Sequence, residues 1–303
     1  MLEFQKLCPG DRERFLQYFK NIPEKGCEYA MVNLLAWGRQ RVHFGEEFLT
    51  IFSQFDRASV YPFPVGSGDI KAALDAILED AHCRGIPCRL TSMTKEECET
   101  VERLYPGRFC FHVDREGFDY VYRIEDLATL KGKRYQSKRN FVNRFRIARP
   151  DCETVVLNPE NLHLAENLSE KWFRMRQERD EGTNFHMEQV ALRRVFSCWE
   201  ALGMEGLVLM DGGEPIAMTV GSHLTEDTFD VHFEKALDMT DGSYAAINQA
   251  FAAYLQEKFP ELKYLNREDD MGLEGLRKAK LSYHPDHLVE KYWARFWEDD
   301  DED

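Results

Sequence analysis

Long apolar runs are absent from this sequence. No stretch among its 303 residues approaches the roughly 18 consecutive apolar residues of a membrane-spanning helix. The first residues, Met1 to Lys6, also lack the pattern of a secretory signal peptide. We therefore expect a cytoplasmic protein without a membrane span.

Motifs for disulfides and for structural zinc are absent as well. The eight cysteines are scattered, the closest pair is Cys83 and Cys88, and no Cys-x-x-Cys occurs. This spacing favours reduced, mostly buried thiols. His284 and His287 flank Pro285, but no cysteine is near enough to suggest a metal site. We expect neither a metal ion nor a permanently bound cofactor.

Positive charge is scarce. The chain has 39 Lys and Arg against 54 Asp and Glu, so its formal net charge is −15 at pH 7 and its pI is about 5.1. The last six residues, 298–303, are all acidic, and the rest of the chain still carries −9. This balance excludes a general nucleic-acid binder and a protein that coats anionic membranes. Any polyanion must be held by a local basic patch.

One such patch is present at residues 131–149, which contain eight basic residues and no acid. A solvated helix face is the usual interpretation of a charge run. Interleaved aromatic and amide residues, such as Tyr135, Phe141 and Asn143, instead favour phosphate contacts beside ring packing. The candidate phosphate-binding residues of this segment are Lys133, Arg134, Lys138, Arg139, Asn143 and Arg144.

The length suits two domains of about 150 residues each. The first half alternates predicted strands, including residues 29–37, with helices such as the one that Asp69 caps, which indicates an α/β or α+β layered domain. The second half has three strands at residues 206–234, a helix at 243–258 and further strands at 262–265 and 287–294. Arg149-Pro150-Asp151 resembles a linker, so we predict domains at 1–149 and 150–303.

The strand at 228–234 alternates in polarity. Alternation places His232 and Glu234 on one polar face together with Asp230. A carboxylate or imidazole here could act as a general base or bind an ammonium group. A solvated strand face is the more common reason for such a pattern, so this role is a hypothesis.

The stretch from Tyr264 to Pro285 is the most informative part of the chain. A short strand ends in three carboxylates, and we expect a helix to begin there with Asp270 as its cap. Gly272 and Gly275 then fall in the first turns, at a cost of about 1 kcal/mol each relative to Ala. Basic residues follow, an order that also suits the dipole of an ordinary surface helix.

Two strings carry a resemblance to a known family. They are Asn-Arg-Glu-Asp-Asp-x-Gly-Leu-x-Gly-Leu-Arg-Lys-Ala-Lys-x-Ser-Tyr-x-Pro at 266–285 and Gly-Lys-Arg-Tyr-Gln-Ser-Lys-Arg-Asn-Phe-Val-Asn-Arg-Phe at 132–145. The chain resembles soluble relatives of the C-terminal domain of phosphatidylglycerol lysyltransferase. The resemblance implies an α+β fold of two tandem acyl-CoA N-acyltransferase (GNAT)-like domains, each a mixed, mostly antiparallel sheet with flanking helices. It covers nearly the whole chain, although no internal repeat is visible.

In such a core, the donor lies where the strand before the long helix separates from the strand after it. Coenzyme A enzymes of the superfamily have a basic or amide residue and two small residues at the turn into the helix. This chain has Met239, Gly242 and Tyr244 there, which weakens acetyl-CoA as the donor. The candidate catalytic residues are His232, Glu234, Asn266, Glu268, Asp269 and Asp270. Further candidate binding residues are Gly242, Tyr244, Asn248, Arg267, Arg277, Lys278 and Lys280.

Three hypotheses remain open from the sequence. The first is an aminoacyltransferase that moves an amino acid from aminoacyl-tRNA to a lipid head group, a peptide or a small molecule. The second is a coenzyme A-dependent N-acyltransferase that acts on a small amine. The third is a non-catalytic protein that uses the same fold to bind a charged ligand.

Overall fold

The computed structural model describes residues 1–20, 22, 24–55, 58–179, 186–237 and 242–297. The acidic run at 298–303 and Met239 therefore lie outside the described residues. The chain forms two compact units, Met1–Asp119 with Val289–Asp303, and Tyr120–Leu288. The predicted domain boundary at residues 149 and 150 does not coincide with this division.

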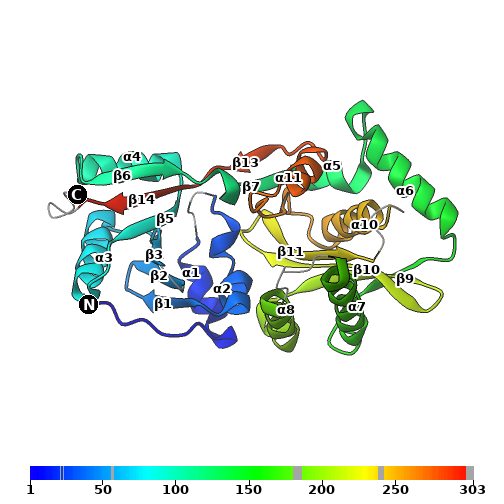
Figure 1. Cartoon of the computed structure of the whole chain (residues 1–303), viewed down its shortest axis with the longest axis horizontal. Coiled ribbons are helices and arrows are strands. Elements are labelled where there is room, and N and C mark those ends of the chain that lie inside the picture. Colours follow the sequence, from blue (N-terminus) through cyan, green and yellow to red (C-terminus); the bar gives the residue numbers. More distant parts are fainter. Residues whose placement is uncertain (21, 23, 56–57, 180–185, 238–241, 298–303) are drawn as a thin grey trace. The chain divides into compact units, whose positions relative to one another are not determined.

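The first unit contains a seven-stranded mixed sheet in the order β1-β2-β3-β5-β14-β6, with β4 paired to β2 (Figure 1). Its β3 and β5 are parallel, and its other recorded strand pairs are antiparallel. The strands are β1 Gln40–Phe44, β2 Phe48–Phe55, β3 Ala58–Pro62, β4 Val65–Gly66, β5 Arg89–Met93, β6 Phe109–Val113 and β14 Tyr292–Phe296. The helices are α1 Arg12–Gln17, α2 Met31–Trp37, α3 Ile70–Arg84 and α4 Lys95–Leu104.

The second unit contains the other seven-stranded sheet, in the order β13-β7-β12-β11-β10-β9-β8 (Figure 1). The strands are β7 Asp119–Arg123, β8 Glu153–Val156, β9 Glu205–Asp211, β10 Glu214–His223, β11 Thr228–Ala236, β12 Tyr264–Asn266 and β13 His287–Val289. The helices are α5 Ile124–Thr129, α6 Gln136–Ala148, α7 His163–Arg179, α8 His186–Ser197, α9 Trp199–Leu202, α10 Ser243–Lys258 and α11 Glu274–Leu281.

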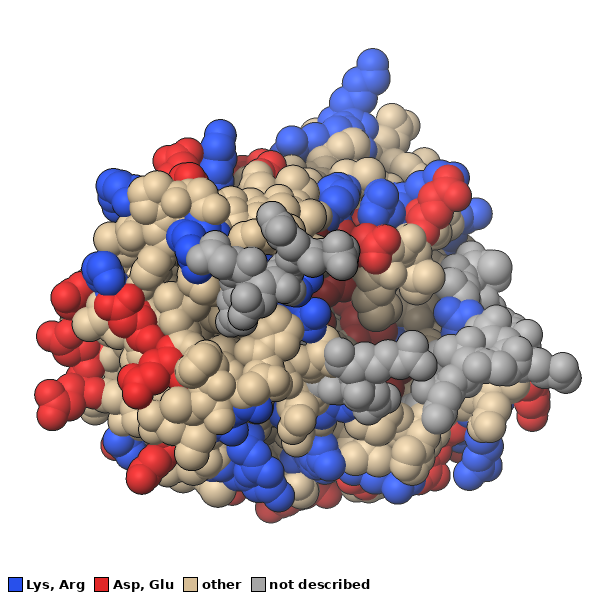
Figure 2. Space-filling model, turned by 60° about the vertical axis from the view of Figure 1, so that its left-hand side comes forward, with Lys and Arg blue, Asp and Glu red and all other residues tan. Residues whose placement is uncertain are grey.

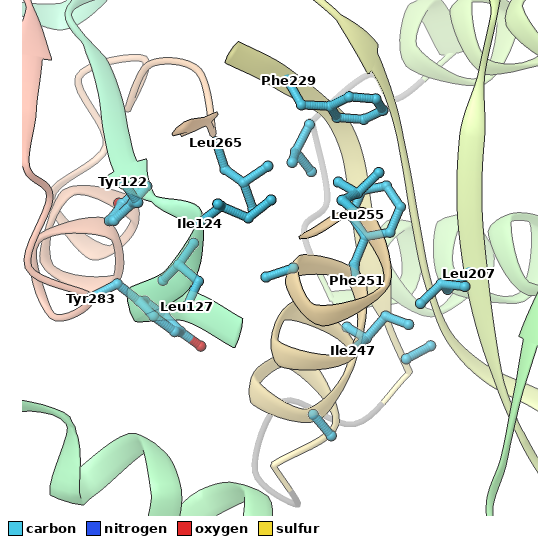
Figure 3. Packing of buried hydrophobic residues seen from close by; sticks show 14 of the residues in the cluster. Tyr122, Ile124, Leu127, Leu207, Phe229, Ile247, Phe251, Leu255, Leu265 and Tyr283 are labelled. Atoms are coloured by element: carbon cyan, nitrogen blue, oxygen red, sulfur yellow. The ribbon is translucent and has the colours of Figure 1, made fainter. Parts of the chain in front are cut away.

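The core of the second unit is built around α10. Ile247, Phe251 and Leu255 lie one turn apart on this helix and pack with Phe229 of β11 and Leu265 of β12 (Figure 3). All five side chains are buried, and each contributes about 1.5–3 kcal/mol of hydrophobic stabilisation. This packing fixes α10 against the two strands that carry the candidate site. Helices α7 and α8 cover the opposite face (Figure 1).

Three sequence predictions need correction. Residues 29–37 contain the helix α2 instead of a strand. A short apolar run does not distinguish the two, and Gly38, at φ +65°, ends the run as a left-handed helix cap. The strand predicted at 287–294 is two strands in different sheets, because β14 pairs with β5 and β6. The last helix begins at Glu274 rather than beside Asp270.

No helix among the described residues is both long and apolar enough to cross a membrane. Figure 2 shows acidic and basic side chains interspersed on one face of the molecule, with acidic ones gathered along its left edge.

Candidate functional site

The strands β11 and β12 separate within the second unit. They pair in parallel at Thr228–Asp230 and Tyr264–Asn266. Beyond Asn266 the chain follows β7 instead, because the Arg267 amide donates to the Tyr120 carbonyl at 3.0 Å. β11 continues beside β10 to Ala236, without β12. The predicted divergence of the two segments is therefore present.

A β-bulge lies in β11 where the separation begins. Val220 of β10 pairs with Phe233, but the next residue of β10, Gly221, pairs with Val231. His232 is thus the extra residue of the bulge, opposite no residue of β10. An inserted residue reverses which side chains face each side of the sheet.

The contacts on either side of the bulge confirm this reversal. Val231 belongs to the apolar cluster around α10. Three residues later, Glu234 also contacts α10, through Asn248. Lys235 lies on the opposite face, with its Nζ 3.6 Å from the ring centroid of Trp172 in α7.

The predicted single polar face of this strand is therefore wrong. Glu234 lies on the α10 face, whereas Asp230 and His232 lie on the α7 and α8 face. The bulge depends on pairing with β10, so local alternation in the sequence could not reveal it.

On the α10 face, Glu234 bridges the separated segments. It accepts a hydrogen bond from Arg267 Nη2 at 2.8 Å and another from Asn248 Nδ2 at 3.2 Å. Burial opposes the charge of Arg267, but the facing Glu234 carboxylate keeps the pKa of Arg267 above its ordinary value. Among the described residues, neither Arg267 Nη1 nor Asn248 Oδ1 has a hydrogen-bond partner, and both atoms are buried. One buried donor and one buried acceptor therefore remain available beside the carboxylate.

A tyrosine ring joins this group to α6. The guanidinium of Arg267 lies 4.8 Å from the ring centroid of Tyr283, and Lys138 Nζ lies 3.8 Å from it. Burial, together with the charge of Arg267, lowers the pKa of Lys138 to about 8. Two cations share this ring, an arrangement that a bound anion would stabilise.

On the α7 and α8 face, His232 is at the centre of a second group. Its Nε2 is 2.8 Å from Ser222 Oγ, and its Nδ1 is 3.3 Å from Glu268 Oε1 and 3.5 Å from Asp230 Oδ2. The His232 side chain has no exposed surface, so a substrate in solution does not reach it directly. Sequence reasoning missed Ser222, whose register opposite Asp230 places it beside the imidazole.

The remaining acidic candidates, Asp269 and Asp270, accept hydrogen bonds from the backbone and from neighbouring side chains. Asp270 is fully buried and accepts hydrogen bonds from Tyr120 Oη at 2.5 Å and from the Gly272 amide at 3.0 Å. It also accepts two from Arg277, at 2.8 and 2.9 Å, and these bonds hold its pKa well below the ordinary range. Asp269 accepts from a backbone amide two residues on. The Asp270 carboxylate, with these donors around it, is a poor proton acceptor.

Asn266 and the cations after the acidic run are also engaged locally. Asn266 is buried and accepts from the Glu268 amide at 2.7 Å. Arg277 is held by Asp270, and Lys278 forms an exposed ion pair with Glu274. Lys280 donates to the backbone carbonyls of residues 267 and 269. Arg277 and Lys280 therefore shape the turn, Lys278 pairs within α11, and the structure does not bring the three together as one phosphate site.

The predicted residues before and on α6 divide into two groups. Arg134 pairs with Asp126, and Arg139 donates to the carbonyls of residues 130 and 132. Lys133, Asn143 and Arg144 are exposed. A shallow depression of about 460 Å³ on the outer side of α6 is lined by Ser137, Asn140, Phe141, Asn143, Arg144 and Ile147.

The start of α10 approaches α6 closely. Gly242 has φ +93°, and a Cβ at this position would lie 2.5 Å from the Phe141 carbonyl oxygen. Glycine is therefore required both by the backbone conformation and by the available space. Tyr244, in the first turn of the helix, packs against the apolar cluster, and burial raises its pKa.

Comparisons with known proteins agree with this architecture. The sequence model of the family described as "Phosphatidylglycerol lysyltransferase, C-terminal" matches residues 19–295. The crystal structure of a conserved protein of unknown function from Bacteroides thetaiotaomicron VPI-5482 is 35% identical. It aligns over 98% of this chain and 100% of that chain, with a TM-score of 0.92. No curated protein gave a significant match.

More distant structures show the same fold. L-PGS from Bacillus licheniformis is 17% identical over 96% of this chain and 93% of that chain, with a TM-score of 0.69. A tandem GNAT protein from the clavulanic acid biosynthesis pathway is 12% identical over 99% of this chain and 100% of that chain, with a TM-score of 0.52. The expected α+β fold with tandem GNAT-like sheets is confirmed. The chain belongs to the phosphatidylglycerol lysyltransferase C-terminal family.

Proposed function

We propose that this protein is an aminoacyltransferase that moves an amino acid from aminoacyl-tRNA to an amine or hydroxyl acceptor. The observation that carries the proposal is the polar group on the α10 face. Glu234 and Asn248 Oδ1 are acceptors there, and Arg267 Nη1 is a donor. Family membership and the similarity to L-PGS support the same class of reaction.

An aminoacyl ester matches this set of groups. Its α-ammonium requires acceptors, which the Glu234 carboxylate and the Asn248 amide oxygen supply. Its carbonyl oxygen gains negative charge when the acceptor attacks, and a preplaced donor such as Arg267 Nη1 stabilises that charge. An acetyl group has no ammonium, so two buried acceptors would gain nothing from it. The chemistry of the site thus favours an aminoacyl donor over an acyl-CoA donor.

The basic segment at residues 131–149 suits the tRNA part of the donor. Lys138 lies next to Arg267 across the Tyr283 ring, and exposed Lys133 and Arg144 belong to the same basic segment. Phosphate contacts by such side chains position a nucleic acid without reading its sequence. The acidic charge of the rest of the protein limits this attraction to the segment itself.

Binding of charged and uncharged tRNA tests the proposal. Wild-type protein should bind aminoacyl-tRNA at least about tenfold more tightly than deacylated tRNA, because an ammonium–carboxylate hydrogen bond contributes about 1.5–3 kcal/mol. Glu234→Gln should abolish the difference while leaving the affinity for deacylated tRNA unchanged. Glu257→Gln is the matched control, since Glu257 is an exposed acid on α10, the helix that Glu234 contacts through Asn248.

The other outcomes would replace the proposal. Equal affinity of the wild type for charged and uncharged tRNA would remove the argument from the ammonium group. A thermal shift with acetyl-CoA and none with aminoacyl-tRNA would favour the coenzyme A-dependent N-acyltransferase. Tight binding of aminoacyl-tRNA without transfer to any acceptor would favour a binding protein on the same fold.

A further inference from the structure

A second cluster of chemically competent side chains lies across the sheet from the proposed aminoacyl site. It consists of Asp230 and His232 from the bulged part of β11 and Glu268 from the segment after β12. Each of the three offers a ligand atom, and these atoms all lie within 4.8 Å of one another. One imidazole with two carboxylates is a common donor set for divalent metal ions.

The two separations from His232 Nδ1 to the carboxylates match coordination better than direct hydrogen bonding. His232 Nδ1 is 3.3 Å from Glu268 Oε1 and 3.5 Å from Asp230 Oδ2. A charge-assisted hydrogen bond between imidazole and carboxylate would be about 2.7–2.9 Å long. Ligands bound tetrahedrally at about 2.0–2.1 Å from one ion are about 3.3–3.4 Å apart. The two distances from His232 Nδ1 are therefore those of ligands around a shared cation.

The other imidazole nitrogen supports this interpretation. His232 Nε2 lies 2.8 Å from Ser222 Oγ. A proton on Nε2, donated to Ser222, leaves the lone pair of Nδ1 directed towards the carboxylates. Metal-bound histidines generally donate their second ring N–H to a neighbouring oxygen in this way, which fixes the tautomer and the ring orientation.

The cluster is buried on one side and reaches solvent at one of its three ligands. The side chains of Asp230 and His232 have no exposed surface, whereas 26% of the Glu268 side chain is exposed. Glu268 therefore marks the route from solvent. An imidazole ligand disfavours Mg²⁺ and Ca²⁺, which prefer oxygen ligands alone, and favours Mn²⁺, Co²⁺ or Zn²⁺.

We propose that Asp230, His232 and Glu268 bind one divalent first-row transition-metal ion. The ion connects the β-bulge in β11 to the segment that leaves β12. It thereby fixes the width of the separation between the two strands from the face opposite Glu234 and Arg267. This site was not expected from the sequence, because Glu268 joins Asp230 and His232 only where the segment after β12 passes β11.

Cobalt titration of the full-length, chelator-treated protein tests the site. Co²⁺ should bind with a stoichiometry of one and produce a visible absorption spectrum of a nitrogen- and oxygen-ligated ion. Saturating Zn²⁺ or Mn²⁺ should raise Tm by about 5 °C, because ligand binding to the native state alone stabilises it. Glu268→Gln and His232→Asn should each weaken Co²⁺ binding by tenfold or more.

Glu274→Gln is the matched control, because Glu274 is an exposed acid in the same segment. It should leave the cobalt spectrum and the affinity unchanged. Glu268 is partly exposed, so its variant should fold even if the His232 variant does not. Absence of the cobalt spectrum in the wild type, or equal Co²⁺ affinity of the wild type and Glu268→Gln, would overturn the proposal.

Discussion

Replacing Asp270 by Asn should destabilise the second unit by about 2–3 kcal/mol. The carboxylate is fully buried, and it accepts from Tyr120 Oη and from Arg277 Nε at the same oxygen, Oδ2. An amide retains one acceptor oxygen for Gly272 but places an NH₂ group against the other donors. The hydroxyl of Tyr120 then loses its hydrogen bond to Oδ2, and such a loss at a buried group costs about 1–3 kcal/mol.

A double-mutant cycle isolates this interaction. Tyr120→Phe alone removes the hydroxyl but leaves the carboxylate its remaining donors, so it should cost about 1 kcal/mol. In Asp270→Asn the hydroxyl faces the new NH₂ group in place of its acceptor, and removing it should recover part of the loss. The coupling free energy between the two positions should therefore be about 1–2 kcal/mol. Urea unfolding, followed by tryptophan fluorescence and circular dichroism, measures each free energy of unfolding.

The pH dependence of the free energy of unfolding tests the same interaction. Hydrogen bonds from Arg277 hold the pKa of Asp270 below its value in the unfolded chain, which is near 3.8. Its stabilising contribution is therefore complete above pH 3.8 and is lost as the pH falls through the folded pKa. The difference between wild type and Asp270→Asn should shrink below pH 4. Glu274→Gln should change stability by less than about 0.5 kcal/mol, and an Asp270→Asn midpoint equal to that control would refute the reasoning.

Two further predictions concern the region around α6. Gly242→Ala should lower the free energy of unfolding by about 2–3 kcal/mol, because this residue has a positive φ and a Cβ would lie 2.5 Å from the Phe141 carbonyl oxygen. Gly275 is exposed with open space around it, so Gly275→Ala should raise the free energy of unfolding by about 0.5–1 kcal/mol. Urea midpoints that move in the same direction would contradict this. The pKa of Lys138 is lowered by burial and by Arg267 to about 8, so the unfolded state binds more protons from there to pH 10.5. The stability of the wild type relative to Lys138→Met should rise over that window, and a flat difference would contradict the assignment.

Much of the local structure could be predicted from the sequence. The helix after Asp69 forms as expected, because its side chain accepts from the amides of residues 71 and 72 and an apolar stripe faces the core. The second half also has the predicted order of three strands, long helix and strand. These features depend on neighbouring residues, so periodicity and capping reveal them.

Features that depend on distant pairing could not be predicted. The strand β14 completes the sheet of the first unit, although nearly 170 residues separate it from the rest of that unit. The domain boundary predicted at the Pro-containing linker, residues 149–151, therefore does not match the boundary between the compact units. The bulge at His232 likewise exists only in the register with β10.

The candidate site was only partly visible in the sequence. Glu234, Arg267 and Asn248 were named in advance, and the structure brings them together at the separation of the strands. Asp270 and Lys280 were also named, but they satisfy local backbone and side-chain groups. A run of charged residues shows where charged side chains lie along the chain. Which group each of them contacts depends on the conformation of the turn that follows β12.

Transfer of an amino acid by the group around Glu234 is the central claim. Incubation of the protein with labelled aminoacyl-tRNAs and cell extract tests this directly, with the label followed into lipid, peptide and small-molecule fractions. Wild type and Glu257→Gln should move label from tRNA into one fraction, and Glu234→Gln should not. Label that stays on tRNA with the wild type, while acetyl-CoA label is transferred instead, would contradict the account.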